Sequence, residues 1–404
     1  MYTIETKLSG SYIVEEIKST DDFLNLREEW NRLVFEDTNS TIFQTWEWNF
    51  NIWKHDEAKL KNLSILLVRE RNGNLIGIAP FFSYEKIILG FRIRIIELIG
   101  KNFTDYRDFI VRPECNMQVY TEILSWLNEN SIKWDIVDLQ YISEESPVFK
   151  NYNILFRDFR ANIQQQNICP YLTLYPDRDL YENLHSQTLI KYLKRKTRKL
   201  EKDLNYRFLT VSSLSELDSH LDKLFDLHRK RRNQKLQFGM FRSENQEQLF
   251  TNLSHDLLER GYLKLSFLFI DDQPATCLYN FEFKNKVYFY QSGLDPNSKF
   301  TKYSLGYIIH SLAIREALKE GMEEYDFLSG NEDYKKDWTE NYRTLYRIKI
   351  ISSDFKKAIF NTNEKLSNFW YGSKFRKSKL IRKLYFWSKN LGKNHKEKAN
   401  TNST

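Results

Sequence analysis

One order of expected elements occurs twice in this sequence, and the duplication restricts the possible folds more than any other feature. In each half an alternating strand leads into an amphipathic helix, a hairpin follows, and then come a strand, a helix and a last strand that holds acids among apolar residues. The first copy places these elements at 12–35, 63–82, 94–99, 117–130 and 134–139, and the second at 206–228, 263–283, 287–292, 305–320 and 323–328. Six elements do not readily repeat in order by chance, so we expect two homologous α/β domains.

The chain has 404 residues, which is more than a single hydrophobic core usually supports. The length and the duplication therefore both indicate two domains. We place an N-terminal domain at 1–170, a C-terminal domain at 171–352, and a basic helical tail with a disordered end at 353–404. Hairpins and short connections are typical of mixed, largely antiparallel sheets flanked by helices. The sequence has no GxGxxG and no GxxxxGKS or GxxxxGKT motif, so we expect neither a Rossmann array nor a P-loop.

Composition limits the class of protein further. Hydrophobic residues make up 41% and charged residues 28% of the chain, which excludes a mostly disordered protein. The three cysteines, Cys115, Cys169 and Cys277, form no CxxC pair, which excludes a disulfide scaffold and a cysteine zinc site. No signal-peptide pattern occurs, and the apolar runs are too short to span a bilayer. We therefore expect a cytoplasmic protein that uses no metal.

The tail carries most of the basic charge. Residues 356–404 contain 13 Lys and Arg against two acids, within a chain of net charge +7. Aromatic residues are interspersed among these cations, a pattern typical of an interfacial helix that contacts anionic lipid. We expect peripheral contact with the inner face of a membrane through 356–398, with a plain helical extension as the alternative.

The second half contains motifs that resemble a known family. SGLDPNSKFTKYSLGYIIHSLAIREALKEG at 292–321, followed by EEYDFLSGNEDYKKDW at 323–338, resembles the BioF2-like or CelD-like branch of the GNAT acyltransferases, which is related to the FemAB aminoacyltransferases. The first half matches more loosely, through FQTWEWNFNIW at 43–53 and LIGKNFTDYRDFIV at 98–111. The resemblance implies two GNAT-like domains, with acyl-CoA bound where two neighbouring strands of a splayed sheet part. The FemAB relatives use aminoacyl-tRNA, so the fold does not fix the donor.

Two segments are candidates for binding the donor. In SLGY, Ser304 is a good N-cap and Gly306 allows close approach to the backbone, so this helix start could hold a pyrophosphate. The usual GNAT loop Q/RxxGxG/A is absent, and an ordinary capped helix is the alternative. The SLGY residues are Ser304, Leu305, Gly306 and Tyr307. In the preceding strand, backbone N–H groups near Tyr290, Ser292 and Gly293 would polarise the thioester carbonyl.

Three residues are candidates for catalysis. Asp326 lies in an apolar strand, where it is either a general base of raised pKa or half of an ion pair with Lys335 or a residue of 191–202. Lys335 would steady an oxyanion or an acceptor phosphate, with a solvated lysine as the alternative. His228 falls on an apolar helical stripe, where it is a base or, with slightly more weight, a core histidine.

Five residues are candidates for acceptor binding. Tyr334 and Trp338 follow the acidic strand, and Trp338 either stacks on a sugar or, as we favour, belongs to the core. Arg229 begins the basic run 229–232, which holds phosphates or is a solvated face. Arg195 and Arg198 lie in the basic segment 191–202, which contacts acceptor or tRNA phosphates or is likewise solvated.

These observations favour an acyl-CoA-dependent N- or O-acyltransferase, with acetyl-CoA as the expected donor. The expected acceptor is a small-molecule or lipid-linked sugar intermediate of an envelope or surface polysaccharide. No nucleophilic cysteine stands out, which agrees with direct transfer without an acyl-enzyme. The alternatives are a FemAB-like transferase that uses aminoacyl-tRNA and a non-catalytic adaptor on the membrane surface. We expect the first domain to be structural or acceptor-binding.

Overall fold

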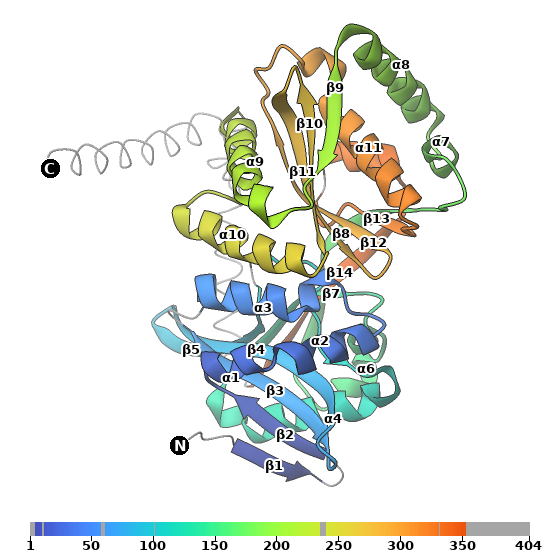
Figure 1. Ribbon diagram of the computed structural model, residues 1–404. Coiled ribbons are helices and arrows are strands. Elements are labelled where there is room, and N and C mark those ends of the chain that lie inside the picture. The colour runs from blue at the N-terminus through green and yellow to red at the C-terminus, as the bar shows by residue number, and fades with distance from the viewer. Residues whose placement is uncertain are drawn as a thin grey trace, which may run out of the picture.

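The computed structural model describes residues 5–9, 12–57, 61–100, 102–234, 240–330 and 332–352 (Figure 1). The predictions made for the tail, including membrane contact through 356–398, lie outside the described residues.

The first half contains the strands of the first expected copy and the helices that cover them. Its strands are β1 (Glu5–Ser9), β2 (Tyr12–Ile17), β3 (Asn62–Glu70), β4 (Leu75–Ile88), β5 (Phe91–Leu98), β6 (Ile110–Val111) and β7 (Ile136–Ser143). Its helices are α1 (Thr20–Asn25), α2 (Arg27–Glu36), α3 (Trp46–Ile52), α4 (Asn116–Glu129), α5 (Pro147–Lys150) and α6 (Tyr152–Leu155). The helix expected at 21–35 is interrupted at Leu26, which ends α1 and begins α2.

The second half repeats this order and adds further elements. Its strands are β8 (Ala161–Thr173), β9 (Tyr206–Thr210), β10 (Leu263–Ile270), β11 (Gln273–Phe283), β12 (Lys286–Leu294), β13 (Glu324–Asp326) and β14 (Tyr342–Ile351). Its helices are α7 (Leu180–Asn183), α8 (Gln187–Asp203), α9 (Leu214–Gln234), α10 (Glu244–Glu259), α11 (Leu305–Lys319) and α12 (Asp333–Trp338). The structure thus confirms the mixed α/β class and the duplicated order of elements.

All described strands belong to one mixed sheet. Its order is β1-β2-β3-β4-β5-β7-β14-β8-β13-β12-β11-β10-β9, and β6 pairs with β4. Neighbours are antiparallel except β5 with β7 and β12 with β13, which are parallel. The last strand, β14, lies between β7 of the first half and β8, and the boundary expected at 170/171 falls within β8. The two halves therefore share a sheet.

The two halves each contain a parallel strand pair, β5 with β7 and β12 with β13, and the two pairs place an aspartate at the equivalent position. Glu97 pairs with Asp138 in the first half, and Tyr288 pairs with Asp326 in the second. Each of these aspartates meets an arginine of β14: Asp138 meets Arg347 at 2.6 Å, and Asp326 meets Arg343 at 3.5 Å. One strand thus supplies a cation to both halves.

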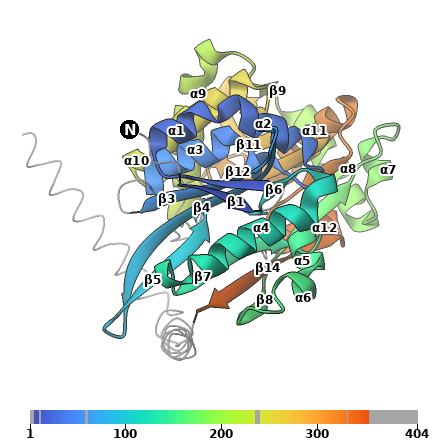
Figure 2. The same ribbon diagram turned by 90° about the horizontal axis from the view of Figure 1, so that it is seen from below.

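Helices cover both faces of the sheet and join the halves. Figure 2 shows α1, α2 and α3 on one side of the first half with α9 and α10 beside them, and α4 on the opposite side. A single apolar cluster includes Trp48 of α3, Leu253 of α10 and Tyr279 of β11. The amide of Asn51 donates to the carboxylate of Asp256 at 2.6 Å across the same junction. These contacts hold α3 of the first half against α10 and the sheet of the second half.

Candidate active site

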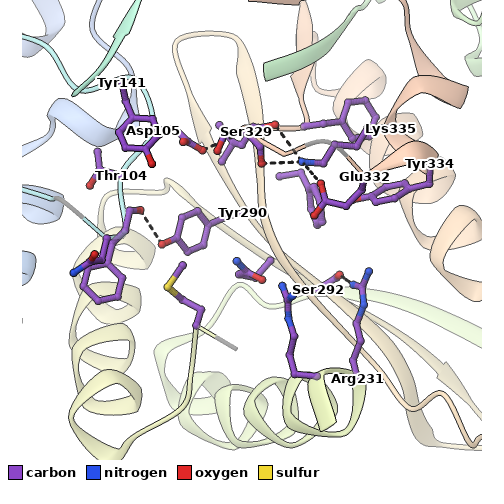
Figure 3. Close-up of a pocket in the computed structure, with 18 residues that line it drawn as sticks. Thr104, Asp105, Tyr141, Arg231, Tyr290, Ser292, Ser329, Glu332, Tyr334 and Lys335 are labelled. Atoms are coloured by element: carbon purple, nitrogen blue, oxygen red, sulfur yellow. Dashed lines mark hydrogen bonds and ion pairs between the residues drawn. The ribbon is translucent and has the colours of Figure 1, made fainter. Parts of the chain in front are cut away.

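A cavity opens where the parallel strands of the second half part. β13 ends at Asp326, whereas β12 continues to Leu294. The pairing of β12 with β11 shifts at this point, because Asn280 faces Phe289 and Tyr279 faces Gln291, so Tyr290 is an extra residue in the ladder. The cavity measures about 330 Å³ and lies between Tyr290 on β12, Asp105 from the first half, and Lys335 after β13 (Figure 3). We call it the transfer cavity.

A second cavity of about 220 Å³ adjoins the first on the side of α11. The two cavities share Arg231, Ser292 and Tyr334 as lining residues. The second cavity has a mainly apolar surface and reaches Gly306 and Tyr307 at the start of α11, so we call it the α11 cavity. Together the two cavities extend from the start of α11 to the point where β12 and β13 separate.

The SLGY segment begins α11, but Ser304 does not cap the helix as expected. Its φ is +59°, a left-handed conformation, and its side chain makes no capping hydrogen bond. Its hydroxyl instead accepts from the hydroxyl of Tyr192 at 2.5 Å. Leu305 is buried in the core, whereas a side chain added at Gly306 would meet no atom within 4 Å. Open space therefore borders the backbone at Gly306.

Of the β12 residues predicted to contact the donor, two line the cavities and one does not. Tyr290 lines the transfer cavity, and its hydroxyl donates to the carbonyl oxygen of Phe103 at 2.9 Å. The hydroxyl of Ser292 accepts from the guanidinium of Arg231. Gly293 packs against α9, because a Cβ there would lie 2.6 Å from the Cβ of Leu227. Its small size thus serves helix packing.

The structure separates Asp326 from the transfer cavity. Its carboxylate is 1% exposed and accepts from the Tyr106 hydroxyl at 2.6 Å and from the Leu328 amide at 2.7 Å. It faces another cavity, of about 150 Å³. Its cationic partner is Arg343, rather than Lys335 or a residue of α8. Burial raises the pKa of Asp326 to about 7, although Arg343 opposes that rise.

Lys335 lines the transfer cavity and is held in place by its surroundings. The residue is 3% exposed, and its ammonium donates to the carbonyl oxygens of Leu328 at 3.2 Å and Ser329 at 3.0 Å. It also pairs with Glu332 at 3.1 Å. Lys335 is therefore an ordered cation, which excludes the solvated alternative.

Tyr334 and Trp338 lie near each other but in different surroundings. Tyr334 lines both cavities. Trp338 is 1% exposed and stacks on Tyr307 with ring centroids 6.1 Å apart. The core interpretation of Trp338 is confirmed.

His228 is a core histidine, the interpretation to which we gave more weight. It is 1% exposed, and its Nδ1 contacts the carbonyl oxygen of Ser292 at 3.2 Å. Its Nε2 accepts from the amide of Met240 at 3.2 Å. Burial, together with Arg232, lowers its pKa to about 4, so the ring is neutral near pH 7. Both ring nitrogens are engaged, which leaves neither for a substrate.

The predicted arginines lie outside both cavities. Arg229 is exposed and pairs with Glu247 across α9 and α10. Arg195 and Arg198 are exposed on α8, which runs beside α11 (Figure 1). Lys196 of the same helix donates to the carbonyl oxygen of Lys302, just before α11, at 2.7 Å. The basic helix thus lies next to the start of α11.

Arg231 and Arg232 of the basic run 229–232 line the transfer cavity, although Arg229 was the member of that run selected for the site. No pattern in the sequence indicated that Asp105 would line it. Asp105 comes from the first half, and its carboxylate accepts from the amide of Ser329 at 3.1 Å. Burial raises the pKa of Asp105. Asp105 was visible only as a member of the quoted segment 98–111, and nothing in the sequence indicated that it crosses to the other half.

The comparisons with known proteins agree with this geometry. Residues 188–336 match the model of the acetyltransferase (GNAT) domain family. No curated protein matches the sequence. Among solved structures, FemX is similar with a TM-score of 0.57 at 11% identity, over 80% of this chain and 96% of that one. A conserved protein of unknown function from Bacteroides thetaiotaomicron VPI-5482 gives a TM-score of 0.54 at 7% identity, over 86% and 100%. L-PGS from Bacillus licheniformis gives 0.50 at 9% identity, over 83% and 96%.

The mixed sheet, with its parallel pair of β12 and β13, is GNAT-like in fold. The match of residues 188–336, which is less than half of the chain, to the acetyltransferase (GNAT) domain model supports an acyltransferase. Within the described ranges, no group of three or more acidic, histidine or cysteine side chains could hold a metal ion. In the same part of the chain, every helix is too short or too polar to cross a membrane.

Proposed function

We propose that this protein transfers an acyl group, with acetyl-CoA as donor, to an amine or hydroxyl group of a sugar intermediate of an envelope or surface polysaccharide. The observation that carries the proposal is the meeting of two cavities at Ser292, Arg231 and Tyr334, beside the point where β12 and β13 part. The resemblance to the BioF2-like or CelD-like branch supports the same donor and the same class of acceptor.

The α11 cavity suits the donor. Its apolar lining matches a pantetheine arm, and open space borders the backbone at Gly306. The first N–H groups of a helix lack partners within that helix, and the helix dipole favours an anion there. A pyrophosphate near Gly306 would therefore place the thioester toward Ser292 and the transfer cavity.

The transfer cavity holds groups that suit the chemical step. The Asp105 carboxylate accepts the proton that the acceptor amine or hydroxyl loses, directly or through water. The Lys335 ammonium stabilises the negative charge that develops on the carbonyl oxygen. The acceptor atom forms its bond to the carbonyl carbon, the carbon–sulfur bond breaks, and CoA leaves as a thiolate that takes up a proton.

A second candidate is a FemAB-like transfer from aminoacyl-tRNA. It is favoured by the exposed cations of α8, including Arg195 and Arg198, because this helix lies next to the start of α11. Contacts of this kind to nucleic-acid phosphates weaken steeply as salt rises.

Parallel assays distinguish the two donors. Release of free thiol from acetyl-CoA in the presence of an acceptor supports the first candidate, and release of deacylated tRNA from aminoacyl-tRNA supports the second. If tRNA is the donor, Arg195→Glu with Arg198→Glu should abolish turnover; if acetyl-CoA is the donor, the pair should leave the transfer chemistry intact. Turnover with neither donor would contradict both candidates.

Peripheral contact with an anionic membrane through 356–398 also belongs to this proposal. Its support is the aromatic and basic composition of that segment. Sedimentation of the protein with anionic vesicles, compared with a variant that lacks 356–404, tests it. Equal sedimentation of the two proteins would contradict it.

A further inference from the structure

The charges around the transfer cavity are unevenly placed. Its lining includes the cations Arg231, Arg232 and Lys335 and the acids Asp105 and Glu332. Lys335 pairs with Glu332 at 3.1 Å, and the proposed function assigns the Lys335 ammonium to the carbonyl oxygen of the donor rather than to the acceptor. Arg231 and Arg232 of α9 and Asp105 of the first half also line the cavity, and Glu332 acts on Arg232 as well as on Lys335.

Arg231 and Arg232 are consecutive on α9, and both line the cavity. Both arginines are partly buried, and burial together with Arg231 lowers the pKa of Arg232. Arg231 donates to the hydroxyl of Ser292, which directs it toward β12. The neighbouring His228 is neutral near pH 7 and adds no charge. Adjacent cations withdrawn from water are stabilised by an anion, and guanidinium groups bind carboxylates and phosphates through paired hydrogen bonds.

The remaining acid lies across the cavity from these arginines. Figure 3 shows Asp105 beside Ser329, on the side of the cavity opposite Arg231. The amide of Ser329 fixes this carboxylate by donating to it at 3.1 Å. A carboxylate held in this way attracts an ammonium group and can accept a proton from it.

The other cations of the basic run face away from the cavity. Arg229 pairs with Glu247 at the surface. Lys230 pairs with Asp226 at 2.8 Å and lines a different cavity. The arrangement at the transfer cavity is therefore specific to Arg231 and Arg232 within this run.

We infer that the acceptor is a small amine that also carries a carboxylate or phosphate, with the amine toward Asp105 and the anion toward Arg231 and Arg232. The inference rests on the proposed function, because it assigns the transfer cavity to the acceptor. A cavity of about 330 Å³ is of the size that binds small molecules. Amino acids and amino sugar phosphates share the required chemistry.

The test compares matched amines that differ only in the anion. Glucosamine 6-phosphate with glucosamine tests a phosphate, and alanine with alaninamide tests a carboxylate. Each is titrated calorimetrically into the CoA-saturated full-length protein, after acetyl-CoA binding has been measured in the same preparation. In at least one pair, the anionic member should bind about ten to one hundred times more tightly, as expected for charge-assisted hydrogen bonds.

Two variants locate the effect. Arg232→Met should reduce the anionic preference about tenfold or more, without changing the affinity for acetyl-CoA. Arg229→Met removes an arginine of the same helix outside the cavity and should leave the preference unchanged. Thermal unfolding of both variants shows whether they fold. If either variant fails to fold, the titrations of the paired amines into the unmodified protein still test the inference.

The outcomes separate the two proposals. Intact acetyl-CoA binding with equal or undetectable affinity for both members of each pair would overturn the inference alone. An equal loss of preference in Arg229→Met and Arg232→Met would also overturn it. Failure of acetyl-CoA itself to bind would overturn the proposed function and the inference with it.

Discussion

Three aspartates, two near β12 and β13 and one in the first half, show how the surroundings of a carboxylate decide what it can do. Asp105 lines the transfer cavity with a raised pKa, and its bond to Ser329 orients it. Asp326 is enclosed by Tyr106 and Arg343 and faces away from that cavity. Asp138, its equivalent in the first half, is held by Arg347 and has a lowered pKa. Only Asp105 therefore combines access to the cavity with a basic form that can take a proton.

The first prediction concerns Asp105. A base must be deprotonated to act, so the rate should fall on the acid side as pH drops through the raised pKa of Asp105. Asp105→Asn should lower kcat by about 10²–10⁴-fold and remove this acid limb. Rates of thiol release across a pH series measure both effects. Asp108→Asn, altered in the same loop but outside the transfer cavity, is the control and should keep the limb. A variant that retains the limb would show that another group is the base.

The second prediction concerns Asp326 and stability. Its pKa is about 7 in the folded protein, whereas an unfolded carboxyl titrates near 3.9. The folded state thus keeps a proton that the unfolded state releases. The resulting stabilisation is complete below about pH 4 and is lost as pH rises through the folded value.

Because an amide does not titrate, Asp326→Asn should remove this contribution. Between about pH 5 and about pH 8, its Tm should decline less, relative to its own value at the lower pH, than the Tm of the unmodified protein. Thermal unfolding followed by circular dichroism gives both profiles. Parallel profiles would mean that Asp326 is ionised throughout this range.

Among the elements, β12 and α9 build the site by packing closely. Gly293 faces α9, where a Cβ would lie 2.6 Å from Leu227 and 2.7 Å from the sulfur of Cys277. This approach brings the last turns of α9, with Arg231, next to Ser292. The glycine therefore helps to position the arginine at the junction of the cavities.

The third prediction tests that packing. Gly293→Ala should destabilise the protein by about 1–3 kcal/mol, because the added methyl group forces α9 and β12 apart. Gly306→Ala is the matched control, since its methyl group would meet no atom within 4 Å. Urea unfolding measures both variants. Equal stabilities for Gly293→Ala and the unmodified protein would contradict the packing argument.

The elements also show what the sequence can predict and what it cannot. Hydrophobic periodicity is local, so it placed the hairpin at 263–283 at the observed outer ends of β10 and β11 and the helix at 305–320 within one residue of α11. The insertion of β14 between β7 and β8 depends on pairing between distant residues, which no local pattern encodes. Asp105 was missed for the same reason. Asp326 was selected because it is an acid in an apolar strand, but that pattern shows only that the carboxylate needs a partner and does not show which cavity it faces.

At the scale of the whole molecule, the shared sheet couples the halves. β14 is the last strand of the second half yet pairs with β7, and Arg343 and Arg347 reach carboxylates in both halves. The transfer cavity also draws residues from both halves, including Asp105 and Lys335. The first half therefore contributes directly to the site, although its own parallel strands hold Asp138 with Arg347.

The fourth prediction follows from this coupling. The described part of the chain should unfold in one cooperative transition, because neither half keeps a complete sheet without the other. Differential scanning calorimetry measures it, and the calorimetric and van't Hoff enthalpies should agree. Two separate transitions would show that the halves are independent.

The central claim is that the α11 cavity binds an acyl-CoA in the second half. Calorimetric titration with acetyl-CoA tests it most directly, using the unmodified protein, Gly306→Glu and Gly306→Ala. We expect saturable binding by the unmodified protein and by Gly306→Ala, whose methyl group fits the open space at this position. Gly306→Glu should lose binding, because it places a negative charge and bulk where the donor's phosphates would lie. No binding by the unmodified protein at millimolar acetyl-CoA, or equal binding by all three proteins, would contradict the account.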